Sequence, residues 1–195
     1  MKKLSIAILS SNRFDLLSAT INSLLATLRY PNWEMIIYNR DKGIGEGWNY
    51  LTESVSGEYV LMCQDDWFFM ERWNWVEQAM AIVDNKEFGI VRLRKNDDGQ
   101  RNEERIKFWT YDKEGLKFAF KEIRCKASGF NLNPFVCSRE FLKRIGKVSK
   151  TGKEKGAAEI QLREKYNARK YKTAKLGNEE NGVCIHIGRG RRIIK

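Results

Sequence analysis

The segment GEYVLMCQDDWFF (residues 57–69) runs from a glycine through an apolar stretch to two adjacent carboxylates, Asp65 and Asp66, which three aromatic residues follow. A short apolar run of this kind, here residues 58–63, is typical of a buried β-strand. Adjacent carboxylates at the end of such a strand repel each other and lose hydration, so a positive charge must compensate them. The segment therefore predicts a strand that delivers an acidic pair to one edge of a sheet.

Strand-like and helix-like segments alternate on both sides of this strand. A helix over 14–28 is predicted by apolar residues at helical spacing, namely Leu17, Ile21, Leu24, Leu25 and Leu28. Ser11 or Asn12 is its expected N-cap. Further strands are predicted over 4–9, 35–39, 88–93 and 183–188, further helices over 45–55, 72–83 and 156–171, and a strand followed by a helix over 134–146. This alternation predicts an α/β domain with a mainly parallel sheet.

Ligands of such sheets bind at the carboxyl ends of the strands, and three loops of this chain are expected to meet there. They are Ser10 to Arg13 after the first strand, Asn39 to Gly47 after the second, and Asp65 with Asp66 after the third. Glycines at 43, 45 and 47 allow close backbone approach to a ligand. The pattern is not a dinucleotide fingerprint, because Trp48 stands at the position of the third glycine, so a nicotinamide enzyme is disfavoured. No Walker-type phosphate loop occurs either.

Length and charge limit the class of protein. A chain of 195 residues predicts one compact domain, and its formal charge of +11 is uneven. Residues 1–90 contain 8 Lys/Arg and 12 Asp/Glu, whereas residues 91–195 contain 28 and 13. The basic second half could attract nucleic acid, anionic lipid headgroups or phosphorylated small molecules, or could serve solubility alone. Residues 94–124 mix charged and aromatic residues and are expected to form short strands or an excursion at one edge of the crevice.

The cysteines give little support for a metal cluster. Cys63, Cys125, Cys137 and Cys184 are widely separated and contain no C-x-x-C pair. Buried free thiols are expected, with a Cys125–Cys137 disulfide as the alternative that spacing alone does not decide.

Five segments taken together carry a family resemblance: LSIAILSSNR, IIYNRDKGIGEGWN, SGEYVLMCQDDW, GFNLNPFVCSREFLKRIG and GAAEIQLREKY. In this order they resemble the successive motifs of family 2 glycosyltransferases, and the resemblance covers about residues 4–171. It implies a GT-A fold and an inverting, hexosyltransferase-type enzyme that moves a sugar from a UDP- or GDP-sugar to an acceptor hydroxyl. The compact size is similar to that of glycosyltransferases from viruses of hyperthermophilic archaea.

The resemblance also assigns a cation site. QDDW is similar to the D-x-D element of the family, in which the last carboxylate, here Asp66, holds Mn²⁺ or Mg²⁺. The compensating positive charge would then be the cation, because hard divalent cations prefer oxygen ligands and stabilise charge on a departing diphosphate. Asp65 matches the middle position, and Gln64 stands where the first Asp is usual. His186, the only histidine, matches the imidazole that completes the site; its ordinary alternative is a structural role.

Donor and acceptor roles follow from the same resemblance. It assigns the donor to Ser10, Asn12, Arg13, Asn39, Gly45, Asn49, Gln64 and Asp65. Asn39 replaces an Asp that accepts a hydrogen bond from uracil, so uridine and guanosine both stay open. Glu159 matches the general base, with Glu164 as the rival on the same helix. Trp67, Phe68 and Phe69 are candidates for stacking on the sugar or for the core.

The implied organisation is one GT-A domain, in which residues 1–94 bind the nucleotide-sugar and residues 95–195 bind a glycan, glycoprotein or lipid acceptor and end in a basic tail. No run of 18 apolar residues occurs, so a spanning helix is not expected and the cytoplasm, or the host cytoplasm for a viral protein, is the expected location, with a membrane surface as the alternative. A nucleic-acid binder, a nucleotidyltransferase and an inactive glycan-binding relic are the competing classes.

Overall fold

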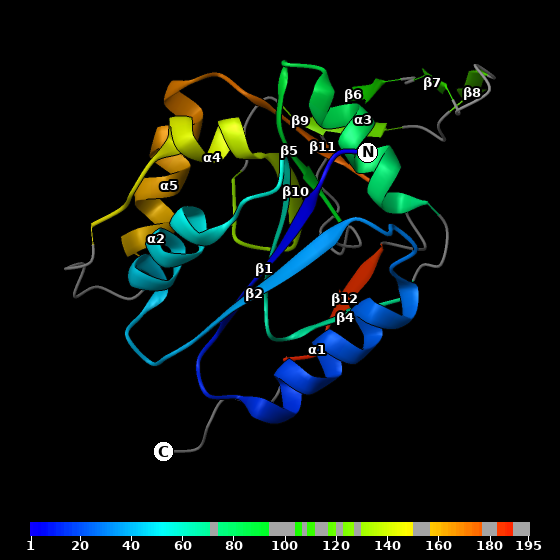
Figure 1. Cartoon of the computed structure of the whole chain (residues 1–195). Helices are drawn as coiled ribbons and strands as arrows, with labels where there is room; N and C mark the ends of the chain where they lie inside the picture. The colour runs from blue at the N-terminus through cyan, green and yellow to red at the C-terminus, as the bar shows by residue number, and fades with distance from the viewer. Residues whose placement is uncertain are drawn as a thin grey trace.

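The computed structural model places an eight-stranded sheet at the centre of the chain, with helices on both faces (Figure 1). It describes residues 1–70, 74–93, 104–106, 109–111, 117–119, 123–126, 130–149, 157–176 and 183–188. The strands are β1 (Leu4–Ser10), β2 (Trp33–Asn39), β3 (Tyr59–Gln64), β4 (Trp67–Phe69), β5 (Phe88–Arg92), β6 (Glu104–Ile106), β7 (Trp109–Tyr111), β8 (Lys117–Ala119), β9 (Ile123–Lys126), β10 (Phe135–Ser138), β11 (Lys172–Lys175) and β12 (Cys184–His186). The helices are α1 (Phe14–Thr27), α2 (Ile44–Ser54), α3 (Trp75–Asp84), α4 (Arg139–Ile145) and α5 (Ala157–Ala168).

The order of the strands in the main sheet is β2-β1-β3-β10-β5-β11-β9-β6. β1 pairs in parallel with both β2 and β3, and β5 pairs in parallel with β11. β10 lies between β3 and β5 and is antiparallel to both. The predicted mainly parallel α/β sheet is thus confirmed, and the reversed directions of β10 and β9 are features that periodicity did not predict.

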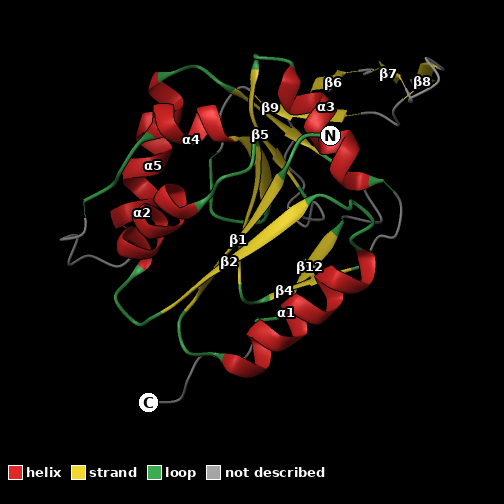
Figure 2. Cartoon of the chain, in the orientation of Figure 1, coloured by secondary structure: helices red, strands yellow, loops and turns green. Residues whose placement is uncertain are grey.

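Two layers of helices cover the sheet, which explains why β1 is apolar on both faces (Figure 2). α1, α3 and the β4–β12 ribbon share one apolar core with one face of the sheet. α2, α4 and α5 share a second core with the opposite face. The carboxyl ends of β1, β2 and β3 therefore open between the two layers.

Two strands were not expected from the sequence. β4 has only three residues, and β11 has the sequence KTAK, in which two lysines interrupt the apolar pattern. Both are too short or too polar for periodicity to reveal them, and they form because neighbouring strands supply hydrogen-bond partners. β6 and β9 extend the sheet at the edge opposite β2, and β7 pairs with β8 separately. The rest of segment 94–124 lies outside the described residues.

Helix α1 corrects two expectations about its ends and faces. Leu25, expected in the apolar stripe, is 43% exposed, while Thr20 and Ser23 are buried. The predicted cap is also wrong, because the N-cap residue is Arg13 and no side chain caps the helix. Asn12 adopts a left-handed backbone with φ of 56°, a conformation that Asn tolerates, and its N–H binds the neighbouring loop. The loop between β1 and α1 is therefore held by a contact with the end of β2 and not by a helix cap.

Three of the four cysteines have the state that was expected. Cys63, Cys137 and Cys184 are buried free thiols, so a Cys125–Cys137 disulfide is excluded. Burial raises the pKa of the Cys63 thiol, and the charges of the nearby acidic pair raise it further. Burial also raises the pKa of the Cys137 thiol, which leaves both groups protonated and unreactive. In the described part of the chain, no helix has the length and apolar character needed to cross a membrane.

Candidate functional site

A pocket of about 210 Å³ lies at the carboxyl ends of the first three parallel strands. Its lining residues come from the end of β1 and the loop after it, from the loop after β2 and the start of α2, and from the last residue of β3: Leu9, Ser10, Ser11, Arg13, Arg40, Gly43, Ile44 and Gln64. Side-chain contacts join the three loops that the sequence placed at this edge of the sheet, because Ser11 and Arg13 contact Asp65 and Ser11 also contacts Asp41. The acidic pair follows Gln64 directly and is buried beside the pocket, in contact with the lining residue Arg13.

Arg13 bridges the two carboxylates of this pair. Its guanidinium donates to both oxygens of Asp65, with Nε 3.3 Å from Oδ2 and Nη2 in closer contact with Oδ1, and its Nη1 lies 3.0 Å from Oδ2 of Asp66. Asp65 is completely buried and Asp66 is 6% exposed. Burial opposes the charge of Arg13, but the charges of Asp66 and Asp65 outweigh it and raise the pKa of the guanidinium. Part of the compensating positive charge is thus supplied by the chain itself.

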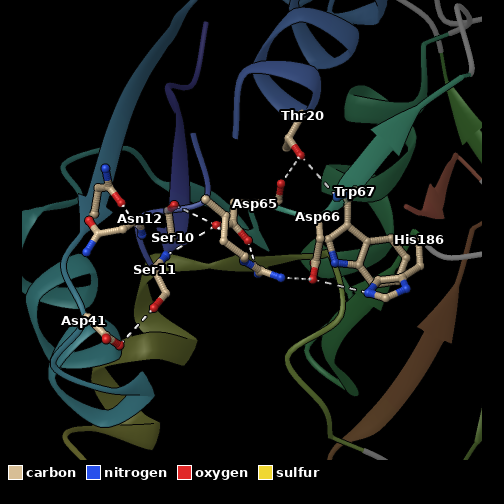
Figure 3. Close-up of polar contacts among 11 residues, drawn as sticks. Ser10, Ser11, Asn12, Thr20, Asp41, Asp65, Asp66, Trp67 and His186 are labelled. Carbon is tan, nitrogen blue, oxygen red and sulfur yellow. Dashed lines mark hydrogen bonds and ion pairs between the residues drawn. The ribbon is translucent and has the colours of Figure 1, made fainter. Parts of the chain in front are cut away.

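Asp65 is held in one position by the end of β1, the residue after it, and the middle of α1. The hydroxyl of Ser10 donates to Oδ2 of Asp65 at 2.7 Å, and the backbone N–H of Ser11 contacts the same oxygen at 3.4 Å. The buried hydroxyl of Thr20 donates to the backbone carbonyl of Asp65 at 2.7 Å and accepts from the N–H of Trp67 at 3.1 Å. Figure 3 shows Thr20 reaching the backbone on both sides of Asp66. The carboxylate loop is therefore preorganised.

Asp66 contacts three consecutive residues that begin at the last residue of β12, namely His186, Ile187 and Gly188. Nε2 of His186 lies 3.3 Å from Oδ2 of Asp66 (Figure 3). The N–H of Ile187 donates to the backbone carbonyl of Asp66 at 2.9 Å. Gly188 packs against the carboxylate so closely that a Cβ atom there would lie 2.8 Å from Oδ2. Antiparallel pairing of β12 with β4 positions this segment, since it places His186 opposite Trp67, with the two rings 5.0 Å apart.

The contacts of Asp66 fit a divalent cation. Its Oδ1 is buried and has no hydrogen-bond partner among the described residues, which is costly unless a ligand or cation meets it. Two carboxylates against one guanidinium also leave an uncompensated negative charge. Asp66 and His186 supply one oxygen and one nitrogen donor, a set that suits Mn²⁺. No cluster of three or more metal-binding side chains occurs within the described ranges, so water or ligand oxygens would complete the coordination.

One ordinary alternative for the acidic pair is wrong. A role as the N-terminal charge of the next helix does not fit the pair, because β4 follows it and α3 begins only at Trp75. The aromatic residues after the pair divide between two environments. Trp67 and Phe69 are buried in the core, whereas Phe68 is 41% exposed, so Phe68 alone of the three is accessible to a ligand.

The loops after β1 and β2 are joined by polar contacts at the rim of the pocket. The N–H of Asn12 donates to Oδ1 of Asn39 at 2.8 Å, and the hydroxyl of Ser11 donates to Asp41 at 3.0 Å. Gly43 has φ of 87°, a conformation that glycine adopts freely, and the chain turns there into α2. The first turn of α2 therefore borders the pocket and presents unpaired backbone N–H groups with the positive end of the helix dipole.

Gly45 and Asn49, two of the expected donor residues, are not part of the pocket lining. A Cβ atom on Gly45 would lie 2.8 Å from the carbonyl of Ser149, so this glycine permits close packing of α2 against the segment after α4. The amide of Asn49 is buried, accepts from the N–H of Val148 and donates to its carbonyl, each at 2.9 Å. In the structure, both residues join α2 to the segment before α5.

The two glutamates of α5 lie in different surroundings. Glu159 is half-buried in the first turn and accepts from the N–H of Leu132 at 3.4 Å. Its neighbour Ala158 packs near Gly45, which puts this turn beside the N-terminus of α2 and hence beside the pocket. Glu164 is exposed. Only Glu159 thus combines a position near the crevice with a contact that orients its carboxylate.

Sequence reasoning missed Thr20, Ser23 and Gly188. Ser23 accepts from the N–H of Phe69 at 3.1 Å, as Thr20 does from Trp67, so two hydroxyls of α1 fix the β3–β4 segment. Their signal was available, because both polar residues stand on the apolar face of a predicted helix. Gly188 carried no local signal, since only the packed structure brings it to Asp66.

Comparison with known proteins identifies the fold. No family model matches the chain, and no curated protein matches it by sequence. Among solved structures it is similar to GalNAc-T7 with UDP, GalNAc and Mn²⁺, with a TM-score of 0.63 and 11% identity over 95% of this chain and 43% of that one. It is also similar to the mannosyltransferase PcManGT from Pyrobaculum calidifontis in complex with GDP-Man and Mn²⁺, with a TM-score of 0.62 and 13% identity over 98% of this chain and 58% of that one.

A third neighbour is S. aureus TarS 1-349 in complex with UDP, with a TM-score of 0.59 and 13% identity over 94% of this chain and 60% of that one. These neighbours are GT-A glycosyltransferases, and the chain has the GT-A fold. It spans between 43% and 60% of the length of these three neighbours.

Proposed function

We propose that this protein is a family 2-like glycosyltransferase that uses a divalent cation to transfer a sugar, with inversion, from a nucleotide-diphosphate-sugar to an acceptor hydroxyl. The observation that carries the proposal is the buried Asp65–Asp66 pair at the carboxyl end of β3, beside a pocket and in contact with His186. The GT-A fold supports it, because structural neighbours are complexes with UDP, or with GDP-Man and Mn²⁺. The hexosyltransferase type is part of the proposal.

The donor diphosphate would lie between the acidic pair and the first turn of α2. Arg13 and Arg40 line this pocket and supply positive charge, and the N–H groups at the start of α2 can donate to phosphate oxygens. Gln64 lines the same pocket, where its amide can bind a ribose or sugar hydroxyl. Asp65, which is buried, would act on the donor through Arg13 and Ser10, the pocket residues that it contacts. Ser10 and the paired Asn12 and Asn39 shape the side toward the base, and because an amide both donates and accepts, UDP- and GDP-sugars are both compatible.

Asp66 and His186 would hold the cation, which, when bound, would stabilise the charge that develops on the departing diphosphate. Asp66 would offer its orphaned Oδ1 and His186 its imidazole nitrogen. The close packing of Gly188 would keep the carboxylate in place. The chain's own residues would thus orient the donor with its anomeric carbon facing the acceptor side.

Glu159 is proposed as the general base that takes the proton from the attacking hydroxyl. It lies on α5, which packs with α2 and α4 on the face of the sheet opposite α1, and the N–H of Leu132 orients its carboxylate. Residues 1–94 would then bind the donor and residues 95–195 a glycan, glycoprotein or lipid acceptor. A cytoplasmic location, or one at a membrane surface, belongs to the same proposal.

The test is a thermal-shift and calorimetric panel of UDP, GDP and their sugars with and without Mn²⁺, on the wild-type chain and on Asp66→Ala. Ligands stabilise a protein only when they bind its folded state, so the correct nucleotide should raise Tm in the presence of Mn²⁺. EDTA and the Asp66→Ala substitution should each abolish the shift. Equal nucleotide affinity in EDTA would contradict metal dependence.

Two controls separate the competing classes. A nucleotidyltransferase would release pyrophosphate from a nucleoside triphosphate, whereas a glycosyltransferase releases a nucleoside diphosphate from its sugar donor, so product analysis distinguishes them. A nucleic-acid binder would bind oligonucleotides tightly, with an affinity that falls steeply with salt and does not need Mn²⁺. Weak oligonucleotide binding at physiological salt is the result expected here.

A further inference from the structure

The guanidinium of Arg13 and the proposed cation would compete for the same carboxylate, that of Asp66. Nη1 of Arg13 lies 3.0 Å from Oδ2 of Asp66, and Nε2 of His186 lies 3.3 Å from that same oxygen. A cation that bridges Asp66 and His186 would therefore stand within a few ångströms of the guanidinium. Two positive charges at such a distance, in a largely buried site, repel each other strongly.

The guanidinium also has an alternative partner available on its other side. Its side chain is 28% exposed and lines the pocket, in contrast to the side chains of Asp65 and Asp66, which are 0% and 8% exposed. A diphosphate bound in that pocket would bring negative charge to Arg13, and Arg forms bidentate contacts with phosphate oxygens readily. The same anion would reduce the repulsion between the guanidinium and the cation.

We propose that Arg13 is a resident counter-ion that makes cation binding depend on the nucleotide diphosphate. Without nucleotide, Arg13 neutralises Asp66 and keeps cation affinity low. A diphosphate in the pocket forms an ion pair with Arg13, which leaves Asp66 free to bind the cation. This inference rests on the proposed function, because it assumes that the Asp66–His186 pair holds the cation.

The coupling must be reciprocal. If the diphosphate raises the affinity for the cation, the cation raises the affinity for the diphosphate by the same factor. Removal of the charge at position 13 should break this relation in a distinctive way, because cation affinity should rise while nucleotide affinity falls. A residue that merely supported the fold would lower both.

The experiment measures Mn²⁺ binding directly, by electron paramagnetic resonance of free Mn²⁺ and by calorimetry, with and without UDP or GDP. The variants are Arg13→Gln and Arg13→Lys. Arg13→Gln removes the charge, whereas Arg13→Lys keeps one charge for Asp65 but cannot span both carboxylates. Arg13→Lys therefore keeps the test valid if the buried Asp65 makes Arg13→Gln unstable, and the folded state of each variant is checked by its thermal melt.

Arg40→Gln is the matched control, because Arg40 lines the same pocket and no ion pair joins it to either carboxylate in the described part of the chain. It should lower nucleotide affinity without any gain in Mn²⁺ affinity. The double variant Arg13→Lys with Asp66→Asn should lose the gain, which would assign the tighter Mn²⁺ binding to this site.

The expected result is that the wild type binds Mn²⁺ weakly alone and at least about tenfold more tightly with nucleotide, while both Arg13 variants bind Mn²⁺ alone about tenfold more tightly than the wild type. Unchanged or weaker Mn²⁺ binding by both Arg13 variants, with nucleotide-dependent Mn²⁺ binding retained in the wild type, would overturn the counter-ion role and leave the glycosyltransferase proposal intact. Failure of the wild type to bind Mn²⁺ under any condition would overturn both.

Discussion

Substitution of Gly188 by alanine should damage the cation site through a single methyl group. The added Cβ would lie 2.8 Å from Oδ2, 3.0 Å from Cβ and 3.2 Å from Cγ of Asp66, distances that real Cβ atoms tolerate only if a neighbour moves. Gly188 is not among the positive-φ glycines, so alanine meets no backbone strain there and the effect is purely steric.

Neither neighbour can move freely. The N–H of Ile187 donates to the carbonyl of Asp66 at 2.9 Å. This hydrogen bond prevents the backbone at Gly188 from moving away from Asp66. The carboxylate of Asp66 must therefore shift by roughly several tenths of an ångström, whereas metal sites tolerate displacements of only about 0.2 to 0.5 Å. We expect Mn²⁺ affinity, measured in the presence of nucleotide, to fall by roughly 10- to 100-fold, with a loss of stability of about 1 to 3 kcal/mol.

Gly57→Ala is the matched control, because its Cβ would lie 2.6 Å from the carbonyl of Lys3, at the start of β3 and away from the acidic pair. It should lower Tm at least as much as Gly188→Ala and leave Mn²⁺ affinity unchanged. If calorimetry finds wild-type Mn²⁺ affinity in Gly188→Ala, the carboxylate can relax without loss and the reasoning is refuted.

Three further outcomes are expected. Glu159→Gln should keep Mn²⁺ and nucleotide binding while sugar transfer falls by roughly two to four powers of ten, and wild-type turnover in this variant together with an impaired Glu164→Gln would show that the base was assigned to the wrong position of α5. Thr20→Val should cost about 2 kcal/mol in urea unfolding and also weaken Mn²⁺ binding, because two backbone groups that flank Asp66 lose their partner; a stable variant with intact binding would exclude this support. Burial opposes the charge of Glu34, but hydrogen bonds from a lysine and two serines outweigh it and lower the pKa of its carboxyl from 4.5 to about 2. Its contribution, about 1 to 2 kcal/mol after allowance for partial exposure, should be fully present above about pH 4.5 and disappear as the pH falls toward 2, so Glu34→Gln should be less stable than the wild type near pH 6 and equal to it near pH 2.

The compensating charge of the acidic pair illustrates how structure refined an expectation. Two buried carboxylates at a strand end require positive charge, and the resemblance to glycosyltransferases assigned that charge to a cation alone. The structure adds Arg13, which was expected only as a donor contact and instead bridges Asp65 and Asp66. The proposed cation would share this task with the guanidinium of Arg13, which is why nucleotide-coupled cation binding can be tested.

Local pattern by itself determined the strands over 4–9, 35–39 and 58–63, the helices between them, and hence the edge at which the acidic pair stands. These features follow from hydrophobic periodicity and from the burial of parallel strands on both faces, which depend only on residues near one another in sequence. The existence of a site at the carboxyl ends was predictable for the same reason.

Only the tertiary structure decided what surrounds the acidic pair. The reversal of β10, the pairing of β12 with β4, and the contact of Gly188 with Asp66 join segments far apart in the chain. Such contacts depend on how both helical layers pack on the sheet, and no local pattern encodes them. For the same reason Asn49, expected at the donor, was found bonded to Val148: an amide in a helix gives no local indication of which distant backbone it will meet.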